Sequence, residues 1–142
     1  MRCCPMATLA LWGIIKTYVD FKPFTCTNNS ELIPLVPVLN LYLELSAANW
    51  NIFFLSERPA SAWNATARNL QNAGYRSWVQ VILRSEDEAG MTVEEYKSRK
   101  KIQLEEEGYQ IKAVIGDQWA DLTGSATSAR TFKLPNPVYH IL

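Results

Sequence analysis

The sequence predicts an α/β protein with a mostly parallel sheet that is covered by helices on both faces. Strand-like and helix-like segments alternate from about residue 33 onward, as in chains built from β-α-β units. The strand-like segments are continuous apolar runs, which is typical of strands buried on both faces. A chain of 142 residues, 48% of them apolar, is long enough to bury one core of this kind.

The first helix is expected from about residue 35, because Pro34 and Pro37 lie where a missing backbone N–H costs little. Apolar residues then recur at spacings of three and four and form one helical face: Leu35, Val38, Tyr42 and Leu45. Residues 49–51 (NWN) have turn chemistry and end this helix. The apolar run at 52–55 (IFFL) predicts a buried strand.

Two further helices follow. One is expected from Pro59 to Gly74, where glycine suits a left-handed cap. Its apolar stripe consists of Ala60, Trp63, Ala67 and Leu70. Residues 92–95 (TVEE) have the spacing of a capping box and predict a charged helix that ends at Gly108, with Ser98 as an alternative start.

Three more strands are expected, one between these two helices and two after them. Residues 78–83 and 111–115 are apolar runs, and the second ends at the turn-forming pair 116–117 (GD). Residues 130–133 predict a last short strand.

Composition excludes several classes of function. Fourteen basic and fourteen acidic residues give no net charge, whereas nucleic-acid binding draws most of its affinity from a basic excess. No apolar run reaches the roughly 18–20 residues that span a bilayer. A structural zinc site needs four ligands, and the few thiols and imidazoles are poorly spaced for one: Cys3, Cys4, Cys26 and His140. We therefore expect neither a nucleic-acid nor a membrane partner.

The first 32 residues leave two interpretations open. The apolar run at 3–15 follows a positive charge, as in a secretory signal, but it is also suited to a strand or helix of the folded domain. Glycosylation triplets at Asn28 and Asn64 favour secretion slightly. We therefore treat 1–32 as an N-terminal segment of open status and 33–142 as the recognisable domain.

Ser56 comes directly after the first buried strand and before the helix that Pro59 opens. A hydroxyl beside the backbone N–H groups of a helix start is suited to binding an oxyanion or a phosphate, and Arg58 adds positive charge there. The alternative is an ordinary capping serine in a strand-to-helix turn.

Asp117 and Asp121 follow another strand, four residues apart. Carboxylates at a strand end can hold Mg²⁺, and Gly116 permits a tight turn beside it. The alternative is one turn residue and one capping residue. Trp119 and Tyr139 could line a pocket here, although packing in the core would explain them equally well.

Lys97 lies near the start of the charged helix, where an ammonium group could neutralise a phosphoryl group. The alternative is a solvated lysine on a charged helix. That alternative is expected to hold for Lys100 and Lys101.

The order of these features is more specific than each alone. A serine after one strand, a lysine at a later helix and a Gly-Asp-x-x-x-Asp pair after the next strand resemble three motifs of the haloacid-dehalogenase-like phosphatases. Within that superfamily, the chain is similar to the plant acid phosphatase and vegetative storage protein family over roughly residues 33–142. The similar segments include 55–58 (LSER), 96–98 (YKS), 116–122 (GDQWADL) and 132–139 (FKLPNPVY).

The resemblance implies a Rossmann-like three-layer fold and hydrolysis of phosphate monoesters through an aspartyl-phosphate, with Mg²⁺ as cofactor. It implies that Ser56, Arg58 and Lys97 bind the phosphate, and that Ser56 and Lys97 act in catalysis. Asp117 would bind the metal, and Asp121 would orient the metal's water shell or pair with the lysine. The family also suggests secretion or a vacuolar location, and a homodimer.

One motif of that family is missing. Its nucleophile stands in an Asp-x-Asp pair after the central strand, but no two of the chain's aspartates are two residues apart: Asp20, Asp87, Asp117 and Asp121. Asp20 is a weak candidate, because the residue two positions on is Lys22, which cannot accept a proton from water. We therefore expect an inactive or severely impaired phosphatase, or a non-catalytic protein of the storage type.

The part of the family's sequence that carries the nucleophile also supplies a strand of the sheet. In the family this central strand lies between the strands that correspond to those ending at Ser56 and Asp117. Two outcomes are open: residues 14–19 fill this place and keep the sheet continuous, or the domain is incomplete at its N-terminus. In the second case backbone groups would be left without partners, and we would expect aggregation or rapid turnover.

Overall fold

The computed structural model describes residues 7–12, 35–124 and 130–134, and shows a single sheet of five parallel strands. The strands are β1 (Ala7–Trp12), β2 (Asn51–Pro59), β3 (Gln80–Arg84), β4 (Gln110–Gly116) and β5 (Arg130–Lys133). Their order across the sheet is β3-β2-β1-β4-β5, so β3 and β5 are the edges. The parallel α/β sheet predicted from the sequence is confirmed.

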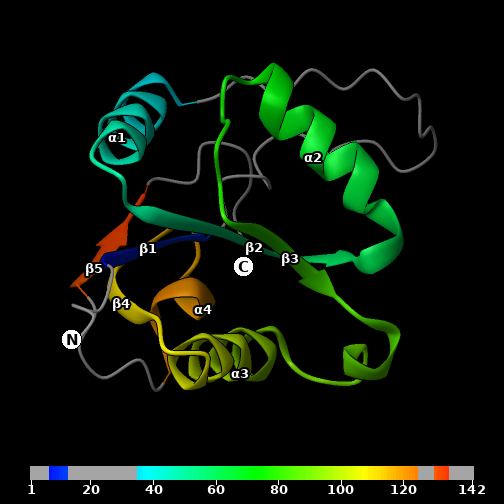
Figure 1. The fold of residues 1–142 in the computed structure, drawn as a ribbon. Helices are drawn as coiled ribbons and strands as arrows, with labels where there is room; N and C mark the ends of the chain where they lie inside the picture. The colour runs from blue at the N-terminus through cyan, green and yellow to red at the C-terminus, as the bar shows by residue number, and fades with distance from the viewer. Residues whose placement is uncertain (1–6, 13–34, 125–129, 135–142) are drawn as a thin grey trace.

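Helices cover both faces of the sheet and complete a three-layer fold (Figure 1). The helices α1 (Val36–Ala47) and α2 (Trp63–Asn72) lie on one face, and α3 (Val93–Glu106) and the short α4 (Trp119–Leu122) lie on the other. Two short 3₁₀ turns, η1 (Ala60–Ala62) and η2 (Glu86–Glu88), follow β2 and β3. None of the helices in the described part of the chain is both long and apolar enough to cross a membrane.

The core has two halves, one on each face of the sheet. Ile52 and Phe54 of β2 pack with the helices α1 and α2, where the Tyr42 and Tyr75 rings contact the Phe54 ring. Phe53 and Leu55 pack on the other face, with Tyr96 and Leu104 of α3 among their neighbours. The strand is therefore buried on both faces, as its continuous apolar sequence predicts.

Local sequence signals set most of the element boundaries. The Thr92 hydroxyl accepts a hydrogen bond from the Glu95 N–H at 3.2 Å, and the Glu95 carboxylate accepts one from the Thr92 N–H at 2.9 Å. The helix α3 therefore begins at this capping box and not at Ser98. Gly74 has a φ of 97° after α2, which is the predicted left-handed cap. The strand β3 begins two residues later than expected, at Gln80.

The prediction for the central strand was wrong in its residues. The strand between β2 and β4 is β1, with Trp12 paired to Leu55 and Leu11 paired to Ile115. Residues 14–19 lie outside the described part of the chain. A central parallel strand is buried on both faces, so the uncharged run ATLALW suits it better than a segment that contains Lys16.

Candidate functional site

The strand ends place two of the predicted residues at one level of the sheet. Leu55 pairs with Trp12, so Ser56 comes one residue beyond the last position of β1. Ile115 pairs with Leu11, so Asp117 comes to the same level on the other side of β1. Ligands of parallel sheets bind at these carboxyl ends, so the register supports the predicted location of the site.

Ser56 is buried at the end of β2 and is linked to α3. Its carbonyl oxygen accepts a hydrogen bond from the Tyr96 hydroxyl at 3.2 Å, and its own hydroxyl accepts one from the Arg58 N–H at 3.3 Å. The first bond fixes the start of α3, and therefore Lys97, beside the end of β2. The Arg58 guanidinium donates to the Thr66 hydroxyl at 3.0 Å, which ties Arg58 to α2.

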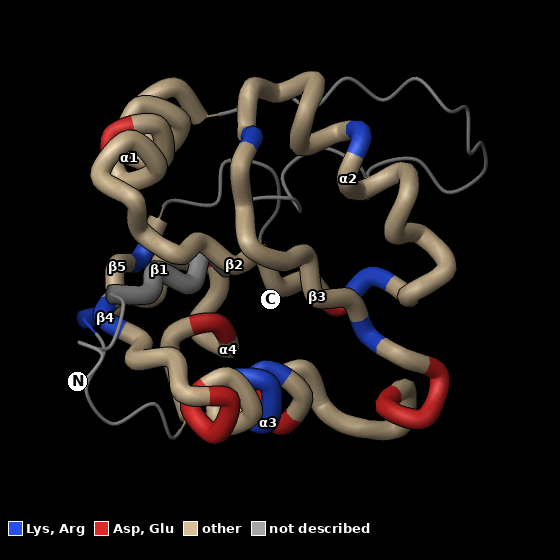
Figure 2. Tube along the Cα trace, in the orientation of Figure 1, with Lys and Arg blue, Asp and Glu red and all other residues tan. Residues whose placement is uncertain are grey.

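Lys97 and Asp121 form an ion pair across α3 and α4, with 2% and 0% of their side chains exposed. The second carboxylate oxygen of Asp121 accepts a hydrogen bond from the Gln118 N–H at 3.0 Å. Figure 2 shows the acidic part of α4 beside the basic part of α3. Lys97 is therefore not a solvated lysine of a charged helix, and Asp121 makes the pair with lysine that the resemblance implies.

Gly116 makes the position of Asp121 possible. A Cβ atom at residue 116 would lie 2.3 Å from the Asp121 Cβ and 2.6 Å from its Oδ2. Such distances are far below van der Waals contact, so only glycine lets the Asp121 side chain lie against the end of β4.

Lys101 was predicted to be a solvated lysine of a charged helix, and this prediction was wrong. Only 1% of it is exposed, and its ammonium donates to the backbone oxygens of Asp121 at 2.9 Å and Thr123 at 2.7 Å. Burial lowers the pKa of Lys101, and the Asp121 charge opposes that shift. The four-residue spacing from Lys97 could have revealed it, because residues four apart share one face of a helix. Lys100 is half-buried and pairs with Glu88 at 2.7 Å, so it is not simply solvated either.

Asp117 is buried at the end of β4, close to a second cation that the sequence did not reveal. Its backbone oxygen accepts a hydrogen bond from the Lys133 ammonium of β5 at 2.7 Å. The same ammonium lies 5.7 Å from the centre of the Trp119 ring. Trp119 is 71% exposed, so core packing does not explain it. Tyr139 and Asp20 lie outside the described residues.

The donors fit a metal only in part. Asp121 is held by Lys97 and Gln118, and Asp117 is the carboxylate to which the resemblance assigns the metal. Mg²⁺ accepts such a set, since it keeps several waters and binds through one or two carboxylates and substrate phosphates. No group of three or more acidic, histidine or cysteine side chains suited to a metal occurs within the described residues.

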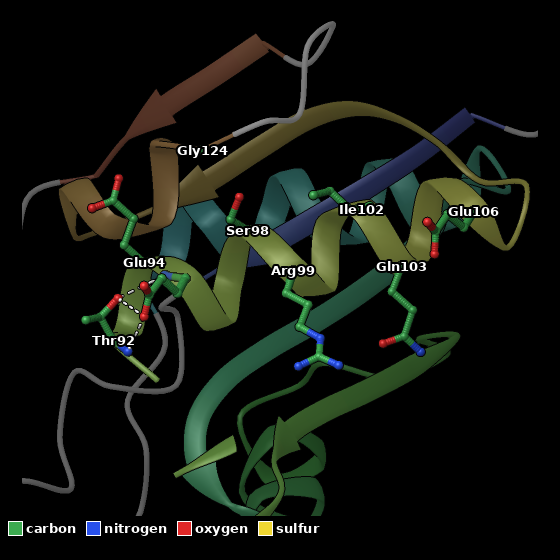
Figure 3. A pocket seen from close by; sticks show the side chains of 9 residues that line it. Thr92, Glu94, Ser98, Arg99, Ile102, Gln103, Glu106 and Gly124 are labelled. Atoms are coloured by element: carbon green, nitrogen blue, oxygen red, sulfur yellow. Dashed lines mark hydrogen bonds between the residues drawn. The ribbon is translucent and has the colours of Figure 1, made fainter. Parts of the chain in front are cut away.

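A separate groove of about 840 Å³ lies along α3 (Figure 3). It is lined by polar and charged side chains such as Ser98, Arg99 and Glu106, with Ile102 between them. None of the predicted site residues lines it. The groove is therefore distinct from the strand ends where Ser56 and Asp117 lie.

Comparison with known proteins decides the family. Residues 16–142 match the family model described as HAD superfamily, subfamily IIIB (acid phosphatase). The chain belongs to this acid phosphatase family. The family assignment made from sequence motifs is confirmed, and members of this family act on phosphate esters. Acid phosphatases of the HAD superfamily generally use a divalent metal.

Curated plant relatives agree with this assignment. Acid phosphatase 1 of Solanum lycopersicum is 44% identical over 128 residues, which are 90% of this chain and 50% of that protein. The stem 28 kDa glycoprotein of Glycine max is 40% identical over 80% of this chain and 46% of that protein. Vegetative storage protein 1 of Arabidopsis thaliana is 36% identical over 80% of this chain and 42% of that protein. The chain therefore spans about half the length of the curated relatives it matches.

A solved structure shows the same fold at low sequence identity. The class C acid phosphatase from Bacillus anthracis with tungstate bound superposes with a TM-score of 0.71 at 16% identity, over 97% of this chain and 70% of that one. The haloacid-dehalogenase-like fold predicted from the motifs is confirmed. The strand β1 precedes the residues that the acid phosphatase family model matches, and neither its sequence nor the three residues after it (GII) contain a carboxylate.

Proposed function

We propose that this acid phosphatase family member binds phosphate groups at the ends of β2 and β4 but hydrolyses phosphate monoesters very slowly or not at all. The observation that carries the proposal is β1. It occupies the central position between the strands that end at Ser56 and Asp117, and it has no carboxylate at its end. Neither β1 nor the three residues after it can therefore supply the aspartate that forms a covalent aspartyl-phosphate.

The remaining residues suit phosphate binding. The Ser56 hydroxyl would donate a hydrogen bond to a phosphate oxygen, and Lys97 would offset its negative charge. Asp117 would hold a Mg²⁺ ion, which when bound screens the repulsion between phosphate and carboxylate. Asp121 positions Lys97 through their buried ion pair.

The loss of rate should be large. Removal of one member of a cooperating catalytic set costs roughly 10³–10⁶ in rate. Asp20 comes eight residues after Trp12, the last residue of β1, and Lys22 follows at the position of the family's acid–base residue. Asp20 therefore stays a weak candidate for the nucleophile.

A non-catalytic storage-type protein is the second candidate. It is favoured by the similarity to vegetative storage protein 1 of Arabidopsis thaliana. For either role, we also propose that the protein is secreted or vacuolar and that it forms a homodimer.

The test is hydrolysis of p-nitrophenyl phosphate at mildly acidic pH with Mg²⁺, together with thermal unfolding in inorganic phosphate. We expect no turnover above background, and a phosphate-dependent rise in the melting temperature that is lost in Ser56→Ala. Turnover that disappears in both Asp117→Asn and Asp20→Asn would refute the inactive assignment. Absence of any stabilisation by phosphate would refute the binding site and favour the storage-type role.

A further inference from the structure

Three lysines bond to the two aspartates that follow β4. The Lys97 ammonium pairs with the Asp121 carboxylate, and the Lys101 ammonium donates to the Asp121 backbone oxygen at 2.9 Å. The Lys133 ammonium donates to the Asp117 backbone oxygen at 2.7 Å. Three positive charges are therefore bonded to two residues that carry one negative charge each.

The negative charge of Asp121 is offset within the protein itself. One of its carboxylate oxygens bonds to Lys97, and the other accepts a hydrogen bond from the Gln118 N–H at 3.0 Å. Lys97 and Lys101 are both buried, and both lie beside this one carboxylate. Glu94 also attracts Lys101, but Glu94 is exposed, so water screens its charge. The helix α3 therefore carries an excess of positive charge beside the end of β4.

The chain differs from its family in the charge after the central strand. The resemblance implies a nucleophilic aspartate there, and a Mg²⁺ ion that screens the repulsion between this carboxylate and the phosphate. Neither β1 nor the three residues after it (GII) contain a carboxylate. A phosphate at the ends of β2 and β4 therefore meets no such repulsion from this part of the chain, and the screening by a metal is not needed there.

We propose that the site at the ends of β2 and β4 binds phosphate without a divalent metal, because the positive charge of Lys97, Lys101 and Lys133 takes the place of the metal. This inference rests on the proposed phosphate site, and it names the cofactor requirement of that site. The Ser56 hydroxyl would donate the hydrogen bond, and the three lysines would attract the anion. Asp117 can still hold Mg²⁺, but phosphate binding does not depend on it.

Calorimetric titration of inorganic phosphate into the full chain tests this requirement, once with Mg²⁺ and once with EDTA. We expect the two dissociation constants to agree within about fivefold, because the lysines supply most of the attraction. A larger loss of affinity in EDTA would overturn the inference and leave the phosphate site intact. Absence of binding under both conditions would overturn the phosphate site and this inference together. The comparison needs no variant to fold.

A carboxylate placed after β1 should restore the need for the metal. Residue 13 directly follows β1 in the sequence, so Gly13→Asp adds a negative charge there, and Gly13→Asn adds a side chain of similar size without the charge. In EDTA, Gly13→Asp should bind phosphate about tenfold more weakly than Gly13→Asn, and Mg²⁺ should reduce this difference to about twofold. Equal phosphate binding by the two variants in EDTA would overturn the inference, because charge after β1 would then not set the metal requirement.

Lys133 allows a test of the lysines themselves. It is exposed on β5, so its replacement leaves the buried pair of Lys97 and Asp121 in place. Lys133→Met should weaken phosphate binding in EDTA by about threefold to tenfold. Lys112→Met removes an exposed charge from within β4 and should leave phosphate binding unchanged. Equal effects of the two variants would overturn the role of Lys133 in place of the metal.

Discussion

The Lys97 ammonium and the Asp121 carboxylate form a buried ion pair that joins α3 to α4 beside the end of β4. The Gln118 N–H donates to the same carboxylate, and the Lys101 ammonium donates to the Asp121 backbone oxygen. Asp121 is therefore bonded from three directions, so it supports the site mechanically as well as electrostatically.

Replacing Lys97 by Met should lower the free energy of unfolding by about 3–5 kcal/mol, because it leaves the Asp121 carboxylate buried without its cation. Urea unfolding followed by circular dichroism measures the loss. Lys112→Met is the matched control: this lysine is exposed on β4, so its loss should change stability by less than about 0.5 kcal/mol. Equal effects of the two variants would contradict the structural importance of the pair.

Replacing Gly116 by Ala should destabilise the fold by about 2 kcal/mol or more, because the added Cβ would overlap the Asp121 side chain. A Cβ at Gly90 meets no atom within 4 Å, so Gly90→Ala should be neutral or stabilise by about 0.5 kcal/mol. Thermal unfolding of the two variants side by side provides the comparison. A tolerated Gly116→Ala would mean that Asp121 does not lie against β4.

The sequence predicted the outer parts of the fold better than its centre. Thr92, Gly74 and the prolines near α1 act through local chemistry, so they could be recognised without tertiary information. The place of β1 could not, because an apolar run near an N-terminus suits a signal and a buried strand equally well. The pairing of Trp12 with Leu55 shows only that the run forms a strand of the sheet in this structure.

The site shows the same division. The chain order of Ser56, Lys97 and Asp117 predicted a shared site; the register places Ser56 and Asp117 at one level of the sheet, and their shared role stays a prediction. Lys101 and Lys133 were missed because their contacts are to backbone oxygens of distant residues. Such contacts depend on how α3 and β5 pack beside α4, so the sequence offers only the four-residue spacing of Lys101 from Lys97 and no signal for Lys133.

Glu88 should make the stability of the protein depend on pH in the acid range. Burial raises the pKa of Glu88, but hydrogen bonds from Lys100 and Ser85 outweigh this effect and hold the pKa below its usual value of 4.5. A carboxyl group with a lowered pKa stabilises the fold above pH 4.5, and this contribution is lost as the pH falls through the folded-state value. We therefore expect the urea concentration at the unfolding midpoint, measured between pH 3 and 7, to fall less steeply with acid in Glu88→Gln than in the unmodified chain. The same pH dependence in both proteins would mean that Glu88 does not contribute to the acid sensitivity of the fold.

The missing nucleophile can be restored as a direct test of its role. Positions 13 and 15 are the first and third residues after β1 in the sequence, and they hold Gly13 and Ile15. The double variant Gly13→Asp, Ile15→Asp recreates the Asp-x-Asp pair after the central strand. We expect hydrolysis of p-nitrophenyl phosphate to rise by at least about tenfold over the unmodified chain, since the nucleophile accounts for most of the lost rate.

The single variant Ile15→Asp is the control, because it adds a carboxylate without the nucleophile and should remain inactive. Adding Asp117→Asn to the double variant should abolish the recovered turnover if the new activity uses the site at the ends of β2 and β4. A double variant that binds phosphate but shows no turnover would mean that the chain lacks more of the catalytic machinery than one motif. The half of the family's length that this chain does not span would then be the place to search for the remainder.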